Sequence, residues 1–387
     1  MAGSCTTTRV VLNDIPLRNN LRASNGACTF TRASSAWYED DTGTVQVALT
    51  NIPRISPTKG LLIEEARTNY WTNSSNAGVW ATNGHVSASI NMESGPFATV
   101  MGGAEVDYIY NIDGVTAGAY QSPSLGTAQG PKTTSAYVAA GNSTSSSLQV
   151  YTAAPGSGGT YNSWNALSAS FNRVVTTATI AGTPDGVIAA LWVPNVLLPV
   201  SGAYIKVAHV QIESGSFATS PILTAGTAVT RAAENNTKVS TTGWSINSGR
   251  VMFDYIPIWS GVSGDNRILV DSRWPGGARG FIIFMDPQAS AELNVVSGNA
   301  GGSTQIASAV LVWTIGVTYR IEYAWGRGNM YLWRTAAGVK TLVASNLTGT
   351  AQMPDTFNPT AGICTSAAGG DPRIANGSIS NLRVSRI

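Results

Sequence analysis

The stretch from Val207 to Glu234, VAHVQIESGSFATSPILTAGTAVTRAAE, decides how the rest of the chain is organised. Its first six residues alternate with a period of two, which predicts a β-strand in which His209 is packed or hydrogen-bonded. Turn-forming residues follow, and Pro221 then removes a backbone donor, so a regular ladder should stop there. The segment therefore predicts the last strand of one β-domain, a corner, and the lead-in to a second β-domain. The period places Val207, His209 and Gln211 on one side of the strand and Ala208, Val210 and Ile212 on the other.

Two similar short motifs occur in the chain. Thr230-Arg-Ala-Ala lies near the end of this stretch, and Thr31-Arg-Ala-Ser lies near the N-terminus. We interpret them as leaders of two halves, because 387 residues are too many for one ordinary core. The predicted division is an N-terminal arm and leader hairpin at 1–70, a β-sandwich at 71–222, a linker at 223–243 and a second β-sandwich at 244–387.

The composition favours an all-β protein. Hydrophobic residues make up 43% of the chain, but charged residues only 11%, against about 25% in an average globular protein. Helix surfaces usually carry Lys, Glu and Arg, so their scarcity favours strands with uncharged polar faces. The formal charge of 23 − 21 = +2 comes without a basic block, which argues against a nucleic-acid partner. The start of the chain does not resemble a secretory signal, and no apolar run reaches the ~18 residues of a membrane helix, so membrane insertion is not expected.

Short strands between Gly, Ser and Asn clusters fill the tract from Trp71 to Ile222. Their number and spacing predict a β-sandwich, and no part of the tract has a sustained helical period. The predicted strands are Asp107–Ile112, Thr133–Ala139, Ser147–Thr152, Trp164–Phe171, Arg173–Ile180, Gly186–Trp192 and Ala203–Ile212.

The tract from Trp244 to Ile387 repeats this style. Its clearest strand is Tyr319–Trp325, which a turn at Gly326–Asn329 connects to Met330–Trp333 as a hairpin. Near the N-terminus a second hairpin is predicted from the strands in Thr29–Tyr38 and Val45–Leu49. The other predicted strands of the C-terminal tract are Val251–Pro257, Gly280–Met285, which should be buried on both faces, and Gly377–Val384.

Few residues point to enzymatic chemistry. Glu64, Glu65 and Arg67 form the densest charge group, which we interpret as an ion-paired corner; the alternative is a carboxylate pair for hydrolysis. No metalloprotease, serine-hydrolase or phosphate-binding motif occurs, so we predict that the protein is not an enzyme.

Cofactors and disulfides are not expected either. The spacing of Cys5, Cys28 and Cys364 matches no metal site, and free cysteines are the simplest interpretation, with a Cys5–Cys28 bridge as the alternative. No cofactor is predicted. A weak signal for calcium comes from the oxygen-bearing side chains of Asp265, Asn266 and Asp271.

Four segments together carry a resemblance to a known class of protein. They are TFTRASSAWYEDDTG (Thr29–Gly43), GLLIEEARTN (Gly60–Asn69), VQIESGSFATSPILTAGTAVTRAA (Val210–Ala233) and GSISNLRV (Gly377–Val384). The set resembles bacteriophage virion proteins built from an N-terminal leader, a carbohydrate-binding-module-like jelly roll and a concanavalin A/laminin-G-like jelly roll. The resemblance covers most of the chain from residue 29 onward, and implies an all-β protein with two jelly-roll sandwiches in tandem after an extended arm.

The resemblance also implies a function and partners. It suggests a non-enzymatic structural protein on the virion exterior, a tail fibre or appendage that contributes to host attachment and is assembled in the host bacterial cytoplasm. A head-decoration or head-fibre protein, a dedicated carbohydrate-binding adhesin and a glycan-degrading enzyme are the alternatives. The implied partners are other virion proteins of the tail or capsid platform, a host-surface glycan and copies of itself, as a homotrimer. The uncharged sandwich faces fit self-association, because they can meet a symmetry mate without burying unpaired charge.

Aromatic residues are the best candidates for sugar contacts. The 11 tryptophans are many for this length, and the C–H faces of a sugar ring can stack on flat aromatic rings beside Asn, Asp and Arg. The alternative is that these rings fill sandwich cores. Two loop-borne groups are the candidate carbohydrate-binding residues, namely Tyr161, Asn162 and Trp164, and Asp271, Arg273 and Trp274.

Residues 1–28 are predicted to form an extended arm. The groups Val10-Val-Leu and Ile15-Pro-Leu are too small for a core of their own, so they should bury against another surface. A free sheet edge of a neighbouring subunit or of the virion platform is the favoured partner, and the first domain of the same chain is the alternative.

Overall fold

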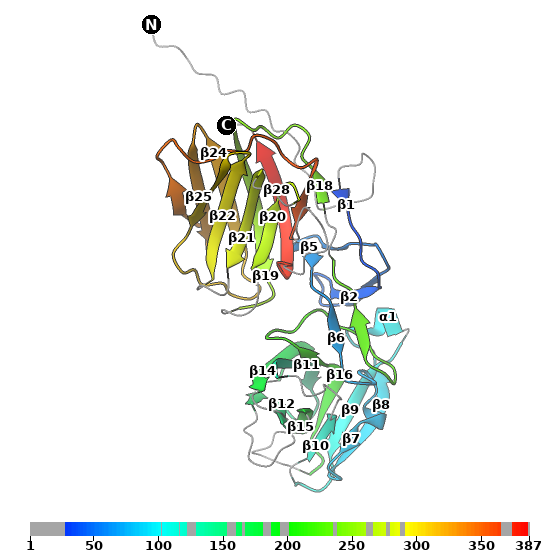
Figure 1. Ribbon diagram of the computed structural model, residues 1–387. Coiled ribbons are helices and arrows are strands. Elements are labelled where there is room, and N and C mark those ends of the chain that lie inside the picture. Colours follow the sequence, from blue (N-terminus) through cyan, green and yellow to red (C-terminus); the bar gives the residue numbers. More distant parts are fainter. Residues whose placement is uncertain are drawn as a thin grey trace. The chain divides into compact units, whose positions relative to one another are not determined.

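The computed structural model consists of two compact units (Figure 1). The terminal sandwich comprises Met1–Ala33, Thr50–Glu65 and Ala233–Ile387, and the inserted sandwich comprises Ser34–Leu49 and Ala66–Ala232. The structure describes residues 28–101, 103–115, 117–121, 129–152, 160–164, 167–180, 187–193, 201–234, 238–260, 266–275, 279–286, 291–364 and 374–385.

The inserted sandwich is built from two five-stranded antiparallel sheets. The chain moves repeatedly from one sheet to the other, which is the jelly-roll arrangement. The first sheet has the order β13 (Thr160–Trp164), β12 (Ser146–Thr152), β15 (Val187–Val193), β10 (Ala117–Gln121) and β7 (Ala81–Thr82). The second has the order β14 (Asn172–Ile180), β11 (Gly130–Ala140), β16 (Tyr204–Ser214), β9 (Val106–Asn111) and β8 (Val86–Glu93).

Aliphatic side chains between these two sheets form the core. Leu148, Val150 and Leu191 come from the first sheet, and Ile205 and Val210 from the second, all completely buried. Successive residues of a strand point to opposite faces of its sheet, so each strand contributes side chains to this core from one face only. Burial of such side chains supplies roughly 1.5–3 kcal/mol each and sets which faces remain outside.

A β-bulge changes the predicted phase of β16. Val207 was expected on the same side as His209, but Val207 and Val210 are both in the core. The pairing with β11 slips between Tyr137 and Val138, so one extra residue of β16 is accommodated and the alternation reverses there. His209 is buried on the other face of the sheet, as the prediction of a packed histidine required.

A small hairpin covers part of the outer face of the second sheet. It consists of β2 (Ala36–Glu39) and β3 (Val45–Ala48), next to the single helical turn α1 (Ala98–Met101) (Figure 1). Val45 donates its backbone N–H to Pro96 at 2.6 Å and packs with Phe97 and Tyr137. This confirms the predicted leader hairpin, and another part of that sheet face, around Tyr108, Tyr110 and Tyr204, stays partly exposed. The remaining elements of this unit are η1 (Ala77–Val79) and the ladder of β6 (Arg67–Asn69) with β17 (Val229–Arg231).

The terminal sandwich contains two seven-stranded antiparallel sheets. Large aromatic rings fill its core: Phe281 lies 5.2 Å from both Tyr323 and Trp325, measured between ring centroids. One sheet has the order β1 (Cys28–Thr29), β18 (Lys238–Ser240), β27 (Thr360–Ile363), β20 (Arg267–Asp271), β21 (Gly280–Asp286), β22 (Glu292–Asn299) and β23 (Gly302–Ala307). The other has the order β26 (Val339–Asn346), β25 (Asn329–Ala336), β24 (Tyr319–Gly326), β19 (Ser248–Pro257), β28 (Gly377–Ser385), β5 (Gly60–Ile63) and β4 (Arg54–Ser56).

The boundaries of the two units differ from those expected. The segment 1–70 is not a separate leader region, because β5 pairs with the last strand, with Ile63 opposite Gly377. The expected linker 223–243 contains β17 and β18, which belong to different units. The two Thr-Arg-Ala motifs lie at places where the chain passes between units, rather than at the start of two halves.

Several predictions fall wholly or partly outside the described residues. The arm prediction concerns residues 1–28, of which only Cys28, at the start of β1, is described. Cys364 is buried and free, whereas Cys5 lies outside the described residues. Within the described part of the chain, no helix is long and apolar enough to cross a membrane.

Candidate functional site

Three tyrosines share the open part of the outer sheet face in the inserted sandwich. Tyr108 and Tyr110 are alternate residues of β9, and Tyr204 lies on β16 directly opposite Tyr110. All three are partly exposed, whereas Ile109 and Ile205 point to the core. We call the surface formed by Tyr108, Tyr110, Tyr204, Glu93 and Lys206 the tyrosine face.

The three rings form a continuous platform. Tyr204 stacks on Tyr108 with 5.0 Å between ring centroids and 21° between ring planes. It lies 5.1 Å from Tyr110, at 37°. The backbone of Gly141 runs against the Tyr204 ring, and an added Cβ there would lie only 2.3 Å from it. The glycine therefore allows the ring to lie close to the sheet, and aromatic neighbours on both sides hold it in place.

A charged pair lies at one end of the platform. Lys206 Nζ lies 2.8 Å from Glu93 Oε1, and the Tyr108 hydroxyl donates to Glu93 Oε2 at 2.9 Å. Partial burial alone would raise the pKa of Glu93, but the hydrogen bonds from Lys206 and Tyr108 lower it. The hydrogen bond to Glu93 in turn raises the pKa of Lys206. The face thus presents a fixed carboxylate–ammonium pair beside aromatic rings.

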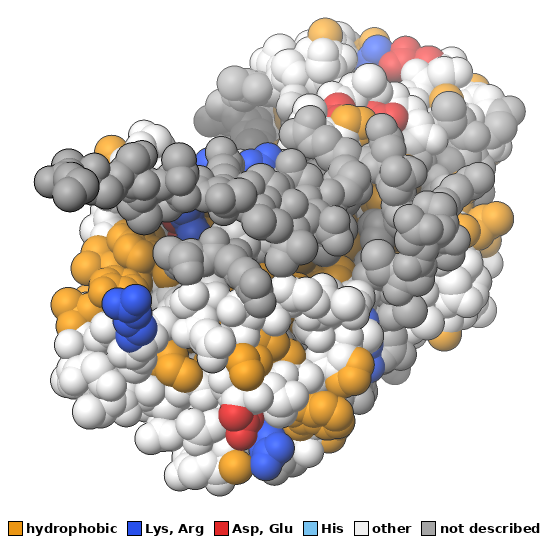
Figure 2. Space-filling view, turned by 90° about the horizontal axis from the view of Figure 1, so that it is seen from above, with side chains coloured by type: hydrophobic (Ala, Val, Ile, Leu, Met, Phe, Trp, Pro, Cys, Tyr) orange, Lys and Arg blue, Asp and Glu red, His pale blue; other side chains and the backbone are white. Residues whose placement is uncertain are grey.

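This arrangement is suited to a flat ligand with many hydroxyl groups. Aromatic side chains contact apolar C–H groups, while the carboxylate accepts and the ammonium donates hydrogen bonds. Ser87 and Ser89 of β8 lie opposite Tyr110 and Tyr108 and add hydroxyl groups to the same side of the sheet. Charged side chains are few on the described surface visible in Figure 2, so charge is concentrated in a small number of places.

The predicted group around Trp274 lies in the terminal sandwich. Trp274 is 41% exposed on the connection from β20 to β21, as expected of a turn residue. Asp271 is buried at the end of β20 and is occupied by Arg273, whose Nε and Nη2 donate to it at 3.0 and 3.2 Å. Of this group, Trp274 and Arg273 are exposed or partly exposed to solvent. The buried Asp271 positions the Arg273 side chain.

The predicted group around Trp164 does not lie on a loop. Tyr161, Asn162 and Trp164 all belong to β13, the edge strand of its sheet, with Trp164 opposite Ser146. The predicted strand Trp164–Phe171 is wrong, because β13 ends at Trp164 and the next strand starts at Asn172. The side chains of the three candidate residues lie outside the described part of the structure.

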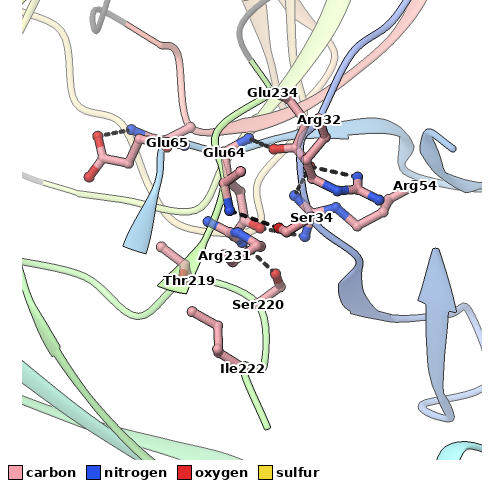
Figure 3. Close-up of polar contacts among 12 residues, drawn as sticks. Arg32, Ser34, Arg54, Glu64, Glu65, Thr219, Ser220, Ile222, Arg231 and Glu234 are labelled. Atoms are coloured by element: carbon pink, nitrogen blue, oxygen red, sulfur yellow. Dashed lines mark hydrogen bonds and ion pairs between the residues drawn. The ribbon is translucent and has the colours of Figure 1, made fainter. Parts of the chain in front are cut away.

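Glu64 forms a buried ion-pair cluster in the terminal sandwich (Figure 3). Glu234 Oε1 accepts from Arg32 Nη1 at 3.0 Å and from Arg54 Nη2 at 2.6 Å, and Arg54 also pairs with Glu64. The four side chains are almost completely buried. The ion-paired interpretation is confirmed for Glu64 alone, and the almost complete burial of its side chain against Arg54 does not fit the alternative of a hydrolytic carboxylate pair.

Neither Glu65 nor Arg67 takes part in that cluster. Glu65 contacts Asn376, which donates to its carboxylate at 2.8 Å. Arg67 lies in the inserted sandwich, with its guanidinium 4.8 Å from the centre of the Phe217 ring. The second Thr-Arg-Ala motif also has a local role there, since Arg231 donates to Ser220 Oγ at 2.7 Å (Figure 3).

No metal site emerges from the described residues, which contain no cluster of three or more His, Cys, Asp or Glu side chains suited to a metal ion. For the weak calcium signal, Asp265 is outside the described residues and the Asp271 carboxylate is held by Arg273.

Sequence reasoning missed the tyrosine face although one signal was present. Tyr108 and Tyr110 are separated by one residue in a correctly predicted strand, so the period of two already placed them on one face. The prediction of sugar-binding residues relied on the high number of tryptophans instead. The position of Tyr204 opposite Tyr110 required knowledge of the strand register, which composition and periodicity do not supply.

Comparisons with known proteins add little. No protein-family model and no curated protein match the sequence. Domains LG4-5 of the mouse laminin alpha1 chain match at 9% identity over 70% of this chain and 86% of that chain, with a TM-score of 0.29. The CBM22-1-CBM22-2 tandem domain of Paenibacillus barcinonensis Xyn10C matches at 9% identity over 84% of this chain and 100% of that chain, with a TM-score of 0.30. Scores this low carry no functional argument, and a bacteriophage origin stays a prediction.

Proposed function

We propose that the protein is a non-catalytic glycan-binding protein and that the tyrosine face is its binding site. The observation that supports this most directly is the stack of Tyr108, Tyr204 and Tyr110 on an open sheet face, ending at the Glu93–Lys206 pair. Such a surface presents a row of partly exposed aromatic rings next to hydrogen-bonding groups. A chain of sugar units matches that repeat better than a single small molecule does.

A hydrolytic role fits this face less well. Glycoside hydrolysis usually needs two carboxyl groups on either side of the bond to be cleaved. Glu93 is the carboxylate of the tyrosine face, whereas the neighbouring Glu105 and Asp107 are buried. Glu105 accepts backbone N–H groups of Gly95 and Phe97 at 3.0 and 2.9 Å, and Asp107 accepts those of Ala77 and Asn91. These two carboxylates therefore have structural tasks.

We further propose that this binding serves host attachment by a bacteriophage virion. The support is the resemblance of the leader, hinge and C-terminal segments to virion proteins with two jelly-roll domains. In this proposal the protein is a homotrimer on the particle exterior, attached to other virion proteins. Immunogold electron microscopy of purified particles tests it: label on tails or capsids is expected, and its absence from particles would overturn the proposal.

Replacing Tyr204 with alanine is expected to weaken glycan binding roughly tenfold, because the central ring of the platform is lost and a tenfold change equals about 1.4 kcal/mol. Tyr204→Phe keeps the ring and should bind like the unchanged protein. The measurement is a glycan array of bacterial capsular polysaccharides and lipopolysaccharides, followed by titration calorimetry on a glycan that binds.

The matched control is Tyr120→Ala. Tyr120 is also partly exposed in the inserted sandwich, but β10 belongs to the opposite sheet. Its loss should leave affinity unchanged. Equal losses for Tyr120→Ala and Tyr204→Ala, or no loss for Tyr204→Ala, would show that the glycan binds elsewhere. Release of reducing ends from a bound glycan would contradict the non-catalytic role.

A further inference from the structure

A second unusual surface lies on the terminal sandwich. It is the outer face of the sheet that contains β28, β19, β24 and β25. In β24 the side chains of Ile321 and Tyr323 are buried in the core, so Arg320 and Glu322 lie on the other face. We call this surface the cationic face; it comprises Arg250, Asp254, Arg320, Glu322, Tyr331, Trp333, Lys340 and Arg383.

The strand register brings these residues together from five neighbouring strands. Arg383 lies opposite Met252, which lies opposite Glu322, which lies opposite Trp333. Lys340 on the edge strand β26 is opposite Thr335, which is opposite Arg320. The residues are far apart in sequence, so no sequence motif predicts the group.

The acidic side chains of this face are buried at the sheet surface, whereas the basic side chains that bind them are exposed to solvent. The Glu322 side chain is 5% exposed and binds both Arg250 and Lys340, the latter at 2.6 Å, and these two bases are 39% and 44% exposed. Asp254 is 8% exposed and accepts two hydrogen bonds from Arg320, at 2.7 and 3.0 Å, while Arg320 is 45% exposed. The solvent therefore meets mainly the cations.

The formal charge of this face is large for this protein. Four bases and two acids give 4 − 2 = +2, which equals the net charge of the whole chain. The carboxylates hold the bases in position at the sheet surface and compensate half of their charge. A fixed group of cations above buried carboxylates attracts anions, and the attraction falls with added salt.

Two aromatic rings lie beside these cations. Tyr331 and Trp333 are alternate residues of β25, and their rings are nearly parallel, 7° apart, with 5.5 Å between centroids. Lys340 Nζ lies 4.7 Å from the centre of the Trp333 ring, so the ammonium is held next to an aromatic surface. A ligand here would meet flat apolar surface and positive charge together.

We propose that the cationic face binds an acidic polysaccharide, that is, a chain of sugar rings bearing carboxylate or sulfate groups. Sugar rings match the parallel aromatic pair, and the repeated anions match the exposed Arg and Lys side chains. Single-stranded nucleic acid also combines rings with anions, but its binding sites are usually strongly basic, and here half of the positive charge is compensated from below. This site is on a different unit from the tyrosine face and does not depend on it.

The test uses the full-length protein and four probes. Oligogalacturonate carries carboxylates, dextran sulfate carries sulfate esters, a malto-oligosaccharide is neutral, and polyglutamate is anionic without sugar rings. Binding to either acidic glycan supports the proposal, and their ranking identifies the preferred anion. Affinity should fall steeply when salt rises from about 0.01 M to about 1 M, which shortens the Debye length from roughly 30 Å to roughly 3 Å.

Two variants separate the ring from the charge. Trp333→Ala should weaken acidic-glycan binding roughly tenfold, and Trp333→Phe should largely retain it. Arg383→Ala, at an exposed position, should weaken binding and reduce its salt dependence. The control Lys59→Ala removes one exposed positive charge at the turn between β4 and β5, at the other edge of the same sheet, and should have no effect.

Several results would overturn the proposal. Equal binding of the neutral malto-oligosaccharide would show that charge is not recognised. Equally tight binding of polyglutamate would show that sugar rings are not recognised. Tighter binding of oligothymidylate would assign the face to nucleic acid. A change of molecular mass in light scattering for Arg383→Ala would assign it to contacts between copies of this chain. Unchanged binding in Tyr204→Ala distinguishes this site from the tyrosine face.

Discussion

Replacing Glu234 with alanine is expected to destabilise the terminal sandwich by roughly 3–5 kcal/mol, because removing one partner from a buried ion-pair cluster leaves buried charge uncompensated. Glu234 accepts hydrogen bonds from Arg32, from Arg54 and from the backbone N–H of Glu64 at 2.8 Å. Arg54 retains Glu64 in the variant, but Arg32 loses its carboxylate partner in this cluster. Hydrogen exchange of peptides from the terminal sandwich, measured across a urea series, reports the change for this unit separately.

A matched control distinguishes burial from charge. Asp355→Ala also removes one carboxylate from the terminal sandwich, but the Arg279–Asp355 pair is 3.8 Å apart with side chains 50% and 39% exposed. Exposed pairs contribute about 0–1 kcal/mol, so this variant should change the free energy of unfolding little. Similar losses in Glu234→Ala and Asp355→Ala would contradict the role assigned to the buried cluster.

Local sequence patterns predicted the strands well where neighbours in sequence are also neighbours in space. The hairpin of β24 and β25 follows from alternation in Tyr319–Trp325 and from the turn at Arg327-Gly328, and both features are local. Val251, Phe253 and Tyr255 are completely buried on one face of β19, as their period of two required. All-β architecture followed in the same way from many short strands and few charged residues.

The interleaving of the two units could not be predicted in this way. β5 pairs with β28, more than 300 residues later in the chain (Ile63 with Gly377), and neither strand carries a signal that identifies its partner. The echo of Thr31-Arg-Ala and Thr230-Arg-Ala suggested equivalent roles. The structure gives them different ones, because Arg32 pairs with Glu234 while Arg231 donates to Ser220.

Functional surfaces were the hardest feature to predict. The binding prediction selected tryptophans on expected loops, whereas both surfaces proposed here lie on sheet faces and combine residues of several strands. Exposure depends on what covers each face: the β2–β3 hairpin buries Tyr137 on the outer face of its sheet but leaves Tyr204 partly exposed. A single sequence gives the alternation of each strand but not the register between strands or the cover over them.

Lowering the pH is expected to destabilise the inserted sandwich through His209. Complete burial and, to a smaller extent, the positive charge of Arg173 lower the pKa of His209 from 6.5 to about 3, and the hydrogen bond with Gln211 only partly opposes them. Below pH 6.5 the unfolded chain therefore takes up a proton that the folded chain does not. Folding stability is lost as the pH falls through this range, by about 1.4 kcal/mol per pH unit, or about 2 kcal/mol between pH 7 and pH 5.

His209→Phe should remove this part of the pH dependence. The ring would remain among aromatic neighbours, since Phe97 lies 5.2 Å and Tyr137 6.3 Å from His209, centroid to centroid. The substitution sacrifices little hydrogen bonding, because Nδ1 of His209 has no partner among the described residues and the Gln211 side-chain oxygen already accepts from the backbone of Ile222 at 2.7 Å. Hydrogen exchange of peptides from 203–214 between pH 7 and pH 5 should show a flatter stability profile than that of the unchanged protein.

The control for this experiment is a core variant without a titrating group. Leu191→Ala removes a completely buried side chain from the same sandwich and should cost about 2–5 kcal/mol at every pH, with the slope preserved. A profile that stays equally steep in His209→Phe would mean that other groups take up the proton on unfolding. A profile that flattens only in His209→Phe would assign the acid sensitivity of this unit to one neutral histidine, which the sheet and the β2–β3 hairpin keep from water and whose protonation requires the unit to open.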